Sequence, residues 1–178
     1  MDLATTTEIE FHRLADEWKQ HCKENSLYSF DQPYLNCDAY RTLAMKGEEI
    51  LPYIRDRVRL ENLAFEDYDK KVKARMRVVL GRDDIRLFNE PYFKMCQDPQ
   101  YKQLCVLYDQ NLFGSPSHLW GYLLAKIVPG FALPIEKEGG NGPIKSVKGF
   151  MGMDVRKTEL AIVKWIDDYL LQKEGQSH

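Results

Sequence analysis

The stretch EGGNGPIKS, residues 138–146, is the part of this sequence that comes closest to a phosphate-binding loop. Such a loop has the pattern Gly-x-x-x-x-Gly-Lys-Ser/Thr, because consecutive backbone N–H groups must wrap a phosphate in front of a helix N-terminus. Gly139 and Lys145–Ser146 fit the spacing, but Ile144 occupies the second glycine position and Pro143 lacks an N–H group. We therefore expect no nucleotide, and no other cofactor, at this loop.

Histidines and carboxylates could instead form a metal site. Glu8 and His12 are four residues apart, as are Glu17 and His21. Dinuclear metal sites in helical bundles use Glu-x-x-His, and zinc protease helices use His-Glu-x-x-His, so neither pattern is present. Pairs at a spacing of four are typical of a solvated helix face. We expect no metal.

Nucleophilic chemistry has equally little support. There is no Gly-x-Ser-x-Gly motif, which places the serine nucleophile in many hydrolases. The four cysteines, Cys22, Cys37, Cys96 and Cys105, contain no Cys-x-x-Cys pair, and we expect reduced, partly buried thiols. The sequence thus favours a protein that is not an enzyme. An enzyme whose site is assembled across several helices stays an alternative.

The most basic part of the chain is residues 55–86. It has ten Lys or Arg and seven Asp or Glu, a local charge of +3 in a chain whose net charge is −2. The simplest interpretation is an amphipathic helix whose long cationic side chains cover the edge of the core. The alternatives are an acidic protein partner or nucleic acid. The residues that we expect to meet such a partner are Lys70, Lys73, Arg77 and Arg82.

A second candidate surface follows the glycine-rich loop. Phe150 and Met151 lie in a segment, 130–153, that contains six glycines and two prolines. Methionine and phenylalanine on such a segment suit an adaptable protein interface, and we name both as candidate partner-binding residues. The simpler interpretation is that the apolar side chains of this segment anchor it on the helical core.

The elements that must position these residues are helices. Apolar residues recur at steps of three and four, and no convincing strand appears because Pro134 interrupts FALPIEK. Gly47 and Gly81 each follow such a stretch and are typical of helix C-caps. We expect about seven helices in antiparallel pairs, within the segments 7–25, 38–45, 48–63, 66–80, 82–90, 101–112, 118–127 and 154–173.

Length and composition point to an ordinary globular protein. The chain has 178 residues, of which 44% are apolar and 29% charged, and this predicts one all-α domain over residues 1–178. The start, MDLATTTEIE, has neither a basic beginning nor an apolar run, so we expect no signal peptide. The apolar stretches are shorter than the ~20 residues of a membrane span. We expect a cytoplasmic protein.

Four segments, taken in order, resemble a type of short prokaryotic all-helical protein. They are FHRLADEWKQH, YRTLAMKGEEILPYI, HLWGYLLAKIVPG and ELAIVKWIDDYL, about a third of the chain. The resemblance implies a short stack of HEAT-like hairpins, and it implies no catalytic residue or activity. It also marks 61–114 as a candidate helical insertion and 131–153 as a second, loop-like one.

These observations lead to one expected function and one main alternative. We expect a small helical module that binds a protein partner through a basic helix face and a mobile loop. The alternative is a protein that associates with nucleic acid through residues 55–86, although the net charge of −2 disfavours strong non-specific DNA binding.

Overall fold

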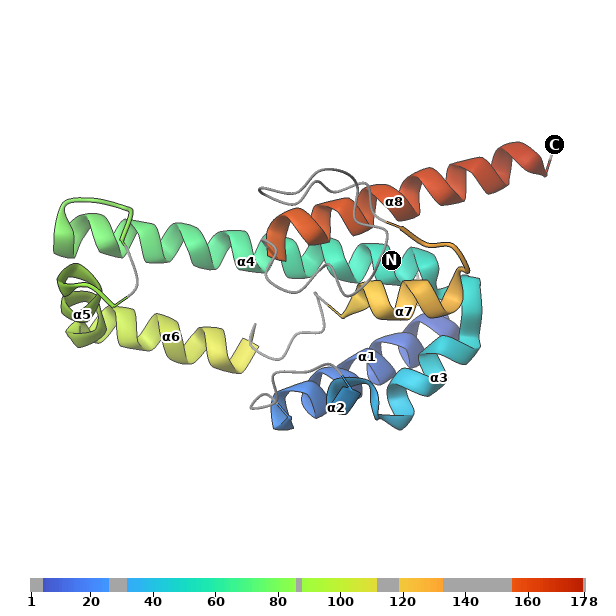
Figure 1. Cartoon of the computed structure of the whole chain (residues 1–178), viewed down its shortest axis with the longest axis horizontal. Helices are drawn as coiled ribbons and strands as arrows, with labels where there is room; N and C mark the ends of the chain where they lie inside the picture. Colours follow the sequence, from blue (N-terminus) through green and yellow to red (C-terminus); the bar gives the residue numbers. More distant parts are fainter. Residues whose placement is uncertain (1–4, 26–31, 86–87, 112–118, 133–154, 178) are drawn as a thin grey trace. The chain divides into compact units, whose positions relative to one another are not determined.

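Every regular element among the residues that the computed structural model describes is a helix (Figure 1). The described residues are 5–25, 32–85, 88–111, 119–132 and 155–177. The helices are α1 (Thr6–Glu24), α2 (Gln32–Leu35), α3 (Asp38–Lys46), a 3₁₀ turn η1 (Gly47–Ile50), α4 (Leu51–Leu80), α5 (Glu90–Gln97), α6 (Pro99–Asn111), α7 (Trp120–Ile127) and α8 (Val155–Gln176). The predicted all-α class is confirmed, and the HEAT-like pairing stays a prediction.

Two predicted boundaries were wrong. Segments 48–63 and 66–80 were expected to be separate helices, but α4 runs without a break from Leu51 to Leu80. Between Pro52 and Gly81 the chain has neither glycine nor proline, so nothing in the sequence ends the helix. A helix was also expected over 82–90. Instead the chain bends after Gly81, which has a φ of +70°, and the next helix is α5.

The chain divides into two compact units. The first comprises Met1–Asn62 and Gly114–His178, and the second is Leu63–Phe113. The second unit falls within segment 61–114, which the sequence analysis singled out; that this segment is an insertion stays a prediction. The N-terminal part of α4 belongs to the first unit and the C-terminal part to the second.

The first unit contains the larger core. Side chains from α1, α3, α4, α7 and α8 meet there, and the fully buried ones include Phe11, Trp18, Leu43, Ile54, Trp120 and Ile166. The rings of Trp18 and Trp120 pack edge to face with their centroids 5.3 Å apart. Trp18 Nε1 donates a hydrogen bond to the Tyr34 carbonyl at 2.9 Å, so the indole N–H has a partner inside the core.

The second unit is built from the C-terminal part of α4 with α5 and α6 (Figure 1). Phe65, Tyr68 and Tyr108 form an aromatic cluster between α4 and α6, with the two tyrosine rings 5.1 Å apart. Among the apolar side chains described in this unit, only Met76 and Met95 are buried. A unit of about 50 residues buries a smaller share of its surface than a larger domain does, and the second unit accordingly has a small core.

Candidate functional site

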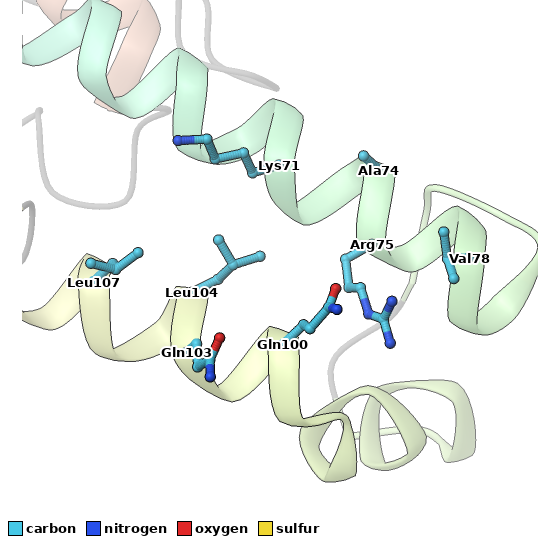
Figure 2. A pocket seen from close by; sticks show the side chains of 8 residues that line it. All are labelled: Lys71, Ala74, Arg75, Val78, Gln100, Gln103, Leu104 and Leu107. Atoms are coloured by element: carbon cyan, nitrogen blue, oxygen red, sulfur yellow. The ribbon is translucent and has the colours of Figure 1, made fainter.

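A groove of about 470 Å³ lies between α4 and α6 in the second unit (Figure 2). From α4 it is lined by Lys71, Ala74, Arg75 and Val78, and from α6 by Gln100, Gln103, Leu104 and Leu107. Each set follows the spacing i, i+3, i+4, i+7, which is one face of an α-helix over two turns. Each wall of the groove is therefore a single helix face.

The two walls run in opposite directions. Figure 2 shows Lys71 toward the end of the groove where Leu107 lies, and Val78 toward the end where Gln100 lies. Leu104 points from α6 into the space between the helices. The groove is thus bounded by two antiparallel helices, and a third helix of ordinary width could lie along it.

Apolar side chains at the groove are open to solvent. Val78 is 72% exposed and Leu107 is 48% exposed. Val106, the neighbour of Leu107 on α6, is 53% exposed but does not line the groove. Single exposed apolar residues are common on protein surfaces, whereas apolar residues gathered along a groove are typical of a binding site.

Asp98 fixes one end of the groove. It precedes Pro99, the first residue of α6, and its carboxylate accepts a hydrogen bond from the Tyr101 N–H at 2.9 Å. This is N-cap geometry with proline at the first helical position. The same carboxylate accepts two hydrogen bonds from Arg75, from Nε at 2.8 Å and from Nη2 at 2.5 Å. One side chain therefore caps α6 and holds it against α4.

The electrostatics of this pair follow from that geometry. The hydrogen bonds from Arg75 lower the pKa of Asp98 to about 2, with a further contribution from the Tyr101 N–H. The same contact raises the pKa of Arg75. Because the Arg75 guanidinium already forms two hydrogen bonds with Asp98, its role is to stabilise the fold.

Lys71 lies at the other end of the groove and is held more weakly. Its Nζ pairs with Asp67 at 2.8 Å, and the two side chains are 60% and 65% exposed. Exposed lysine–carboxylate pairs one helical turn apart contribute only about 0.3–0.5 kcal/mol. Lys71 can therefore exchange this partner for another carboxylate at little cost.

The structure pairs each of the four basic residues named from the sequence with a carboxylate. The pairs are Lys70 with Glu66 (3.1 Å), Lys73 with Asp69 (2.8 Å), Arg77 with Asp83 (2.6 Å) and Arg82 with Asp84 (3.1 Å). Lys70, Lys73 and Arg77 share one face of α4 by their spacing, and none of the four lines the groove. The four cations named from the sequence therefore each have a carboxylate partner close by in the chain.

The other candidates of the sequence analysis lie outside the described residues. Phe150 and Met151 fall within 133–154, as does the glycine loop at 138–146. The groove was not predicted from the sequence, although the sequence of its α6 wall contains a signal. Asp98 followed by Pro99 is a typical helix start, and residues 100, 103, 104 and 107 then have the spacing of one helix face.

The first unit contains a polar network around Arg57 at the edge of its core. Arg57 donates to Asp16 at 2.6 Å and to Glu61 at 3.2 Å, and Glu61 also accepts a hydrogen bond from Trp120 Nε1 at 3.2 Å. These contacts satisfy the indole N–H of a fully buried tryptophan and balance a largely buried arginine. The network thus has a structural role in the edge of the core.

The buried Cys22 thiol is not activated. Cys22 is buried, and burial together with the proximity of Cys37 raises its pKa to about 12. A reactive cysteine has a lowered pKa, because the thiolate is the nucleophile. All four cysteines are free, and Cys37, Cys96 and Cys105 are partly exposed.

A second hollow, of about 450 Å³, lies where the end of α4 meets α5. Its lining comes from α5, from Glu90 to Gln97, and among the described residues α4 contributes only Leu80. It lacks the two facing helix stripes of the α4–α6 groove, so the α4–α6 groove is the better-formed site.

Three further observations bear on function. Within the described ranges, no three His, Cys, Asp or Glu side chains gather where they could hold a metal ion. In the same part of the chain, no helix combines the length and apolar character needed to cross a bilayer. No protein-family model, no curated protein and no solved structure matches this chain.

Proposed function

We propose that this chain is a non-enzymatic protein-interaction module that binds its partner through the α4–α6 groove of the second unit. The observation that carries the proposal is the pair of facing helix stripes with Val78 and Leu107 left open to solvent. A groove of this kind suits the apolar face of a partner element.

The small hydrophobic core of the second unit supports the same proposal. Only Met76 and Met95 are buried among its described apolar residues, while Val78, Val106 and Leu107 are each about half exposed or more. Burying apolar surface contributes about 25 cal/mol per Å², so a partner in the groove would stabilise a unit that has little core of its own.

The ion pairs of α4 support a protein partner over nucleic acid. The described cations from Lys70 to Arg82 each have a carboxylate within 3.1 Å. Each of these carboxylates places a negative charge beside its cation, so this surface has mixed charge, whereas nucleic acid draws its affinity from clusters of cations with little negative charge nearby.

Affinity purification with a matched pair of variants tests the proposal. The full-length chain carries Leu107→Glu in one variant and Val106→Glu in the other. The two residues are neighbours on α6 and similarly exposed, but only Leu107 lines the groove. We expect proteins recovered at stoichiometric amounts with the wild type to persist with Val106→Glu and to be lost with Leu107→Glu.

Two results would refute the proposed function. One is a partner that both variants retain, which would place binding elsewhere on the chain. The other is recovery of no stoichiometric partner by the wild type. Circular dichroism of both variants checks that they are equally folded, and Val78→Glu, on the opposite wall, serves as a second groove variant.

A further inference from the structure

The charges around the groove indicate what kind of partner segment it takes. We infer that the occupant is an amphipathic α-helix whose apolar face enters the groove and which places an Asp or Glu beside Lys71. This inference rests on the proposed function and adds the chemistry of the partner to it.

The shape of the groove favours a helix. Its two walls are antiparallel helices, and each contributes residues from i to i+7, a length of about 10 Å at 1.5 Å per residue. A third helix laid along such a pair would present its own residues at i, i+3 or i+4, and i+7 to Ala74, Val78, Leu104 and Leu107. A strand would leave its backbone donors and acceptors unpaired here, because both walls are helices whose backbone groups bond within each helix.

The charge of the lining sets the sign of the partner. Lys71 and Arg75 are the charged members of the lining among the described residues, and no carboxylate side chain joins them there. Arg75 is engaged by Asp98 through two hydrogen bonds, whereas Lys71 is paired with the exposed Asp67. A partner carboxylate at the Lys71 end would meet a cation that is free to reorient, in a groove that becomes partly desolvated on binding.

A second copy of this chain suits the groove less well. In a two-fold symmetric dimer, each groove would face the lining of the other, and the described part of that lining has no carboxylate for Lys71. In such a dimer Lys71 would keep only its pair with Asp67, whereas a partner carboxylate would add a second favourable contact. The occupant is therefore a different chain with acidic residues.

Selection from a helical peptide library tests this inference. The peptides have fixed leucines at i, i+4 and i+7, and the flanking positions are randomised over Glu, Lys, Gln and Ala. Wild-type full-length chain serves as the bait, with Leu107→Glu as the counter-selection bait. We expect the enriched peptides to carry glutamate near one end of the leucine stripe.

A charge-reversal pair then locates the acidic contact. Lys71→Glu is expected to weaken an enriched glutamate peptide about tenfold, and Lys70→Glu to leave its affinity within about twofold. Both lysines are exposed and both pair with a carboxylate four residues earlier, but only Lys71 lines the groove. A Lys71→Glu bait should also bind the matching lysine peptide more tightly than the wild type does.

The outcomes separate the inference from the proposed function. Enriched peptides that are lysine-rich, or that show no charge preference, would overturn the acidic partner and leave the groove as a binding site. No enrichment over the Leu107→Glu bait would contradict the helix and the groove together. A concentration-dependent dimer that Leu107→Glu abolishes and Val106→Glu retains, measured by analytical ultracentrifugation, would make the second copy the occupant.

Discussion

Arg75 and Asp98 are joined by two hydrogen bonds, of 2.8 and 2.5 Å, that fasten the start of α6 to the C-terminal part of α4. The Asp98 side chain is only 8% exposed and also caps α6 through the Tyr101 N–H. The groove lies between the two helices that this contact joins. The Arg75–Asp98 pair therefore sets the width of the groove at one end.

Replacing Asp98 should loosen the start of α6. Asp98→Asn removes the ion pair with Arg75 and keeps a capping oxygen, so we expect α6 to separate from α4 more readily and the Tyr101 amide and its neighbours to exchange hydrogen faster. Asp67→Asn, which removes an exposed pair on α4, is expected to leave α6 protection unchanged. Native-state hydrogen exchange followed by NMR measures both. Equal protection of α6 in the two variants would show that the pair is not a structural anchor.

The acid stability of the second unit should depend on this same carboxylate. Arg75 lowers the Asp98 pKa from 3.8 to about 2, so the folded chain binds this proton less tightly than the unfolded chain. The contribution to stability is present above pH 3.8 and is lost as the pH falls toward about 2. A carbon-detected NMR titration of the carboxyl should give a pKa well below 3.8. Arg75→Gln should raise it toward 3.8, whereas Arg77→Gln should not; a normal pKa in the wild type would contradict the geometry.

Gly81 and Gly175 should respond to alanine with opposite signs. Neither site has any atom within 4 Å of an added Cβ, so only the backbone matters. Gly81 has a φ of +70°, where alanine costs about 1–2 kcal/mol. Gly175 lies in the last turn of α8 without a positive φ, so alanine there should stabilise the chain by up to about 1 kcal/mol. Urea unfolding of both variants measures the two effects, and a loss of stability in both would contradict this assignment.

Trp120 should contribute through its indole N–H as well as its volume. It is fully buried and donates to Glu61 at 3.2 Å. Trp120→Phe removes the donor to Glu61 Oε2 and opens a cavity, so we expect a loss of about 2 kcal/mol or more in the free energy of unfolding. Trp165→Phe, at a partly exposed site, should cost less. Urea unfolding followed by circular dichroism compares them, and an equal loss would rule out the special role of Trp120.

The sequence was enough for the helical class because local signals agree along most of the chain. Phe11, Leu14 and Trp18 repeat at helical spacing and are buried together. Gly81 ends its helix with a positive φ, as its position indicated. The stretch after Gly81 was wrongly predicted to be a helix. Asp83 and Asp84 pair there with Arg77 and Arg82, and such local pairs compete with helix formation.

The candidate site could not be predicted from a single sequence, because it depends on tertiary packing. The groove depends on which face of α4 lies beside which face of α6, and no local pattern specifies that contact. Charge counting drew attention to Lys70, Lys73 and Arg77, whose partners Glu66, Asp69 and Asp83 become apparent only once helix register and the bend after Gly81 are known.

The most direct test of the groove is an NMR footprint of a bound partner. The full-length chain, labelled at leucine and valine methyl groups, is titrated with the purified partner that the wild type recovers. We predict that the methyl signals of Val78, Leu104 and Leu107 shift while those of Val106, exposed on the same helix, stay in place. Shifts confined to Val106, or to the exposed leucines Leu160 and Leu171 on α8, would contradict a binding site between α4 and α6.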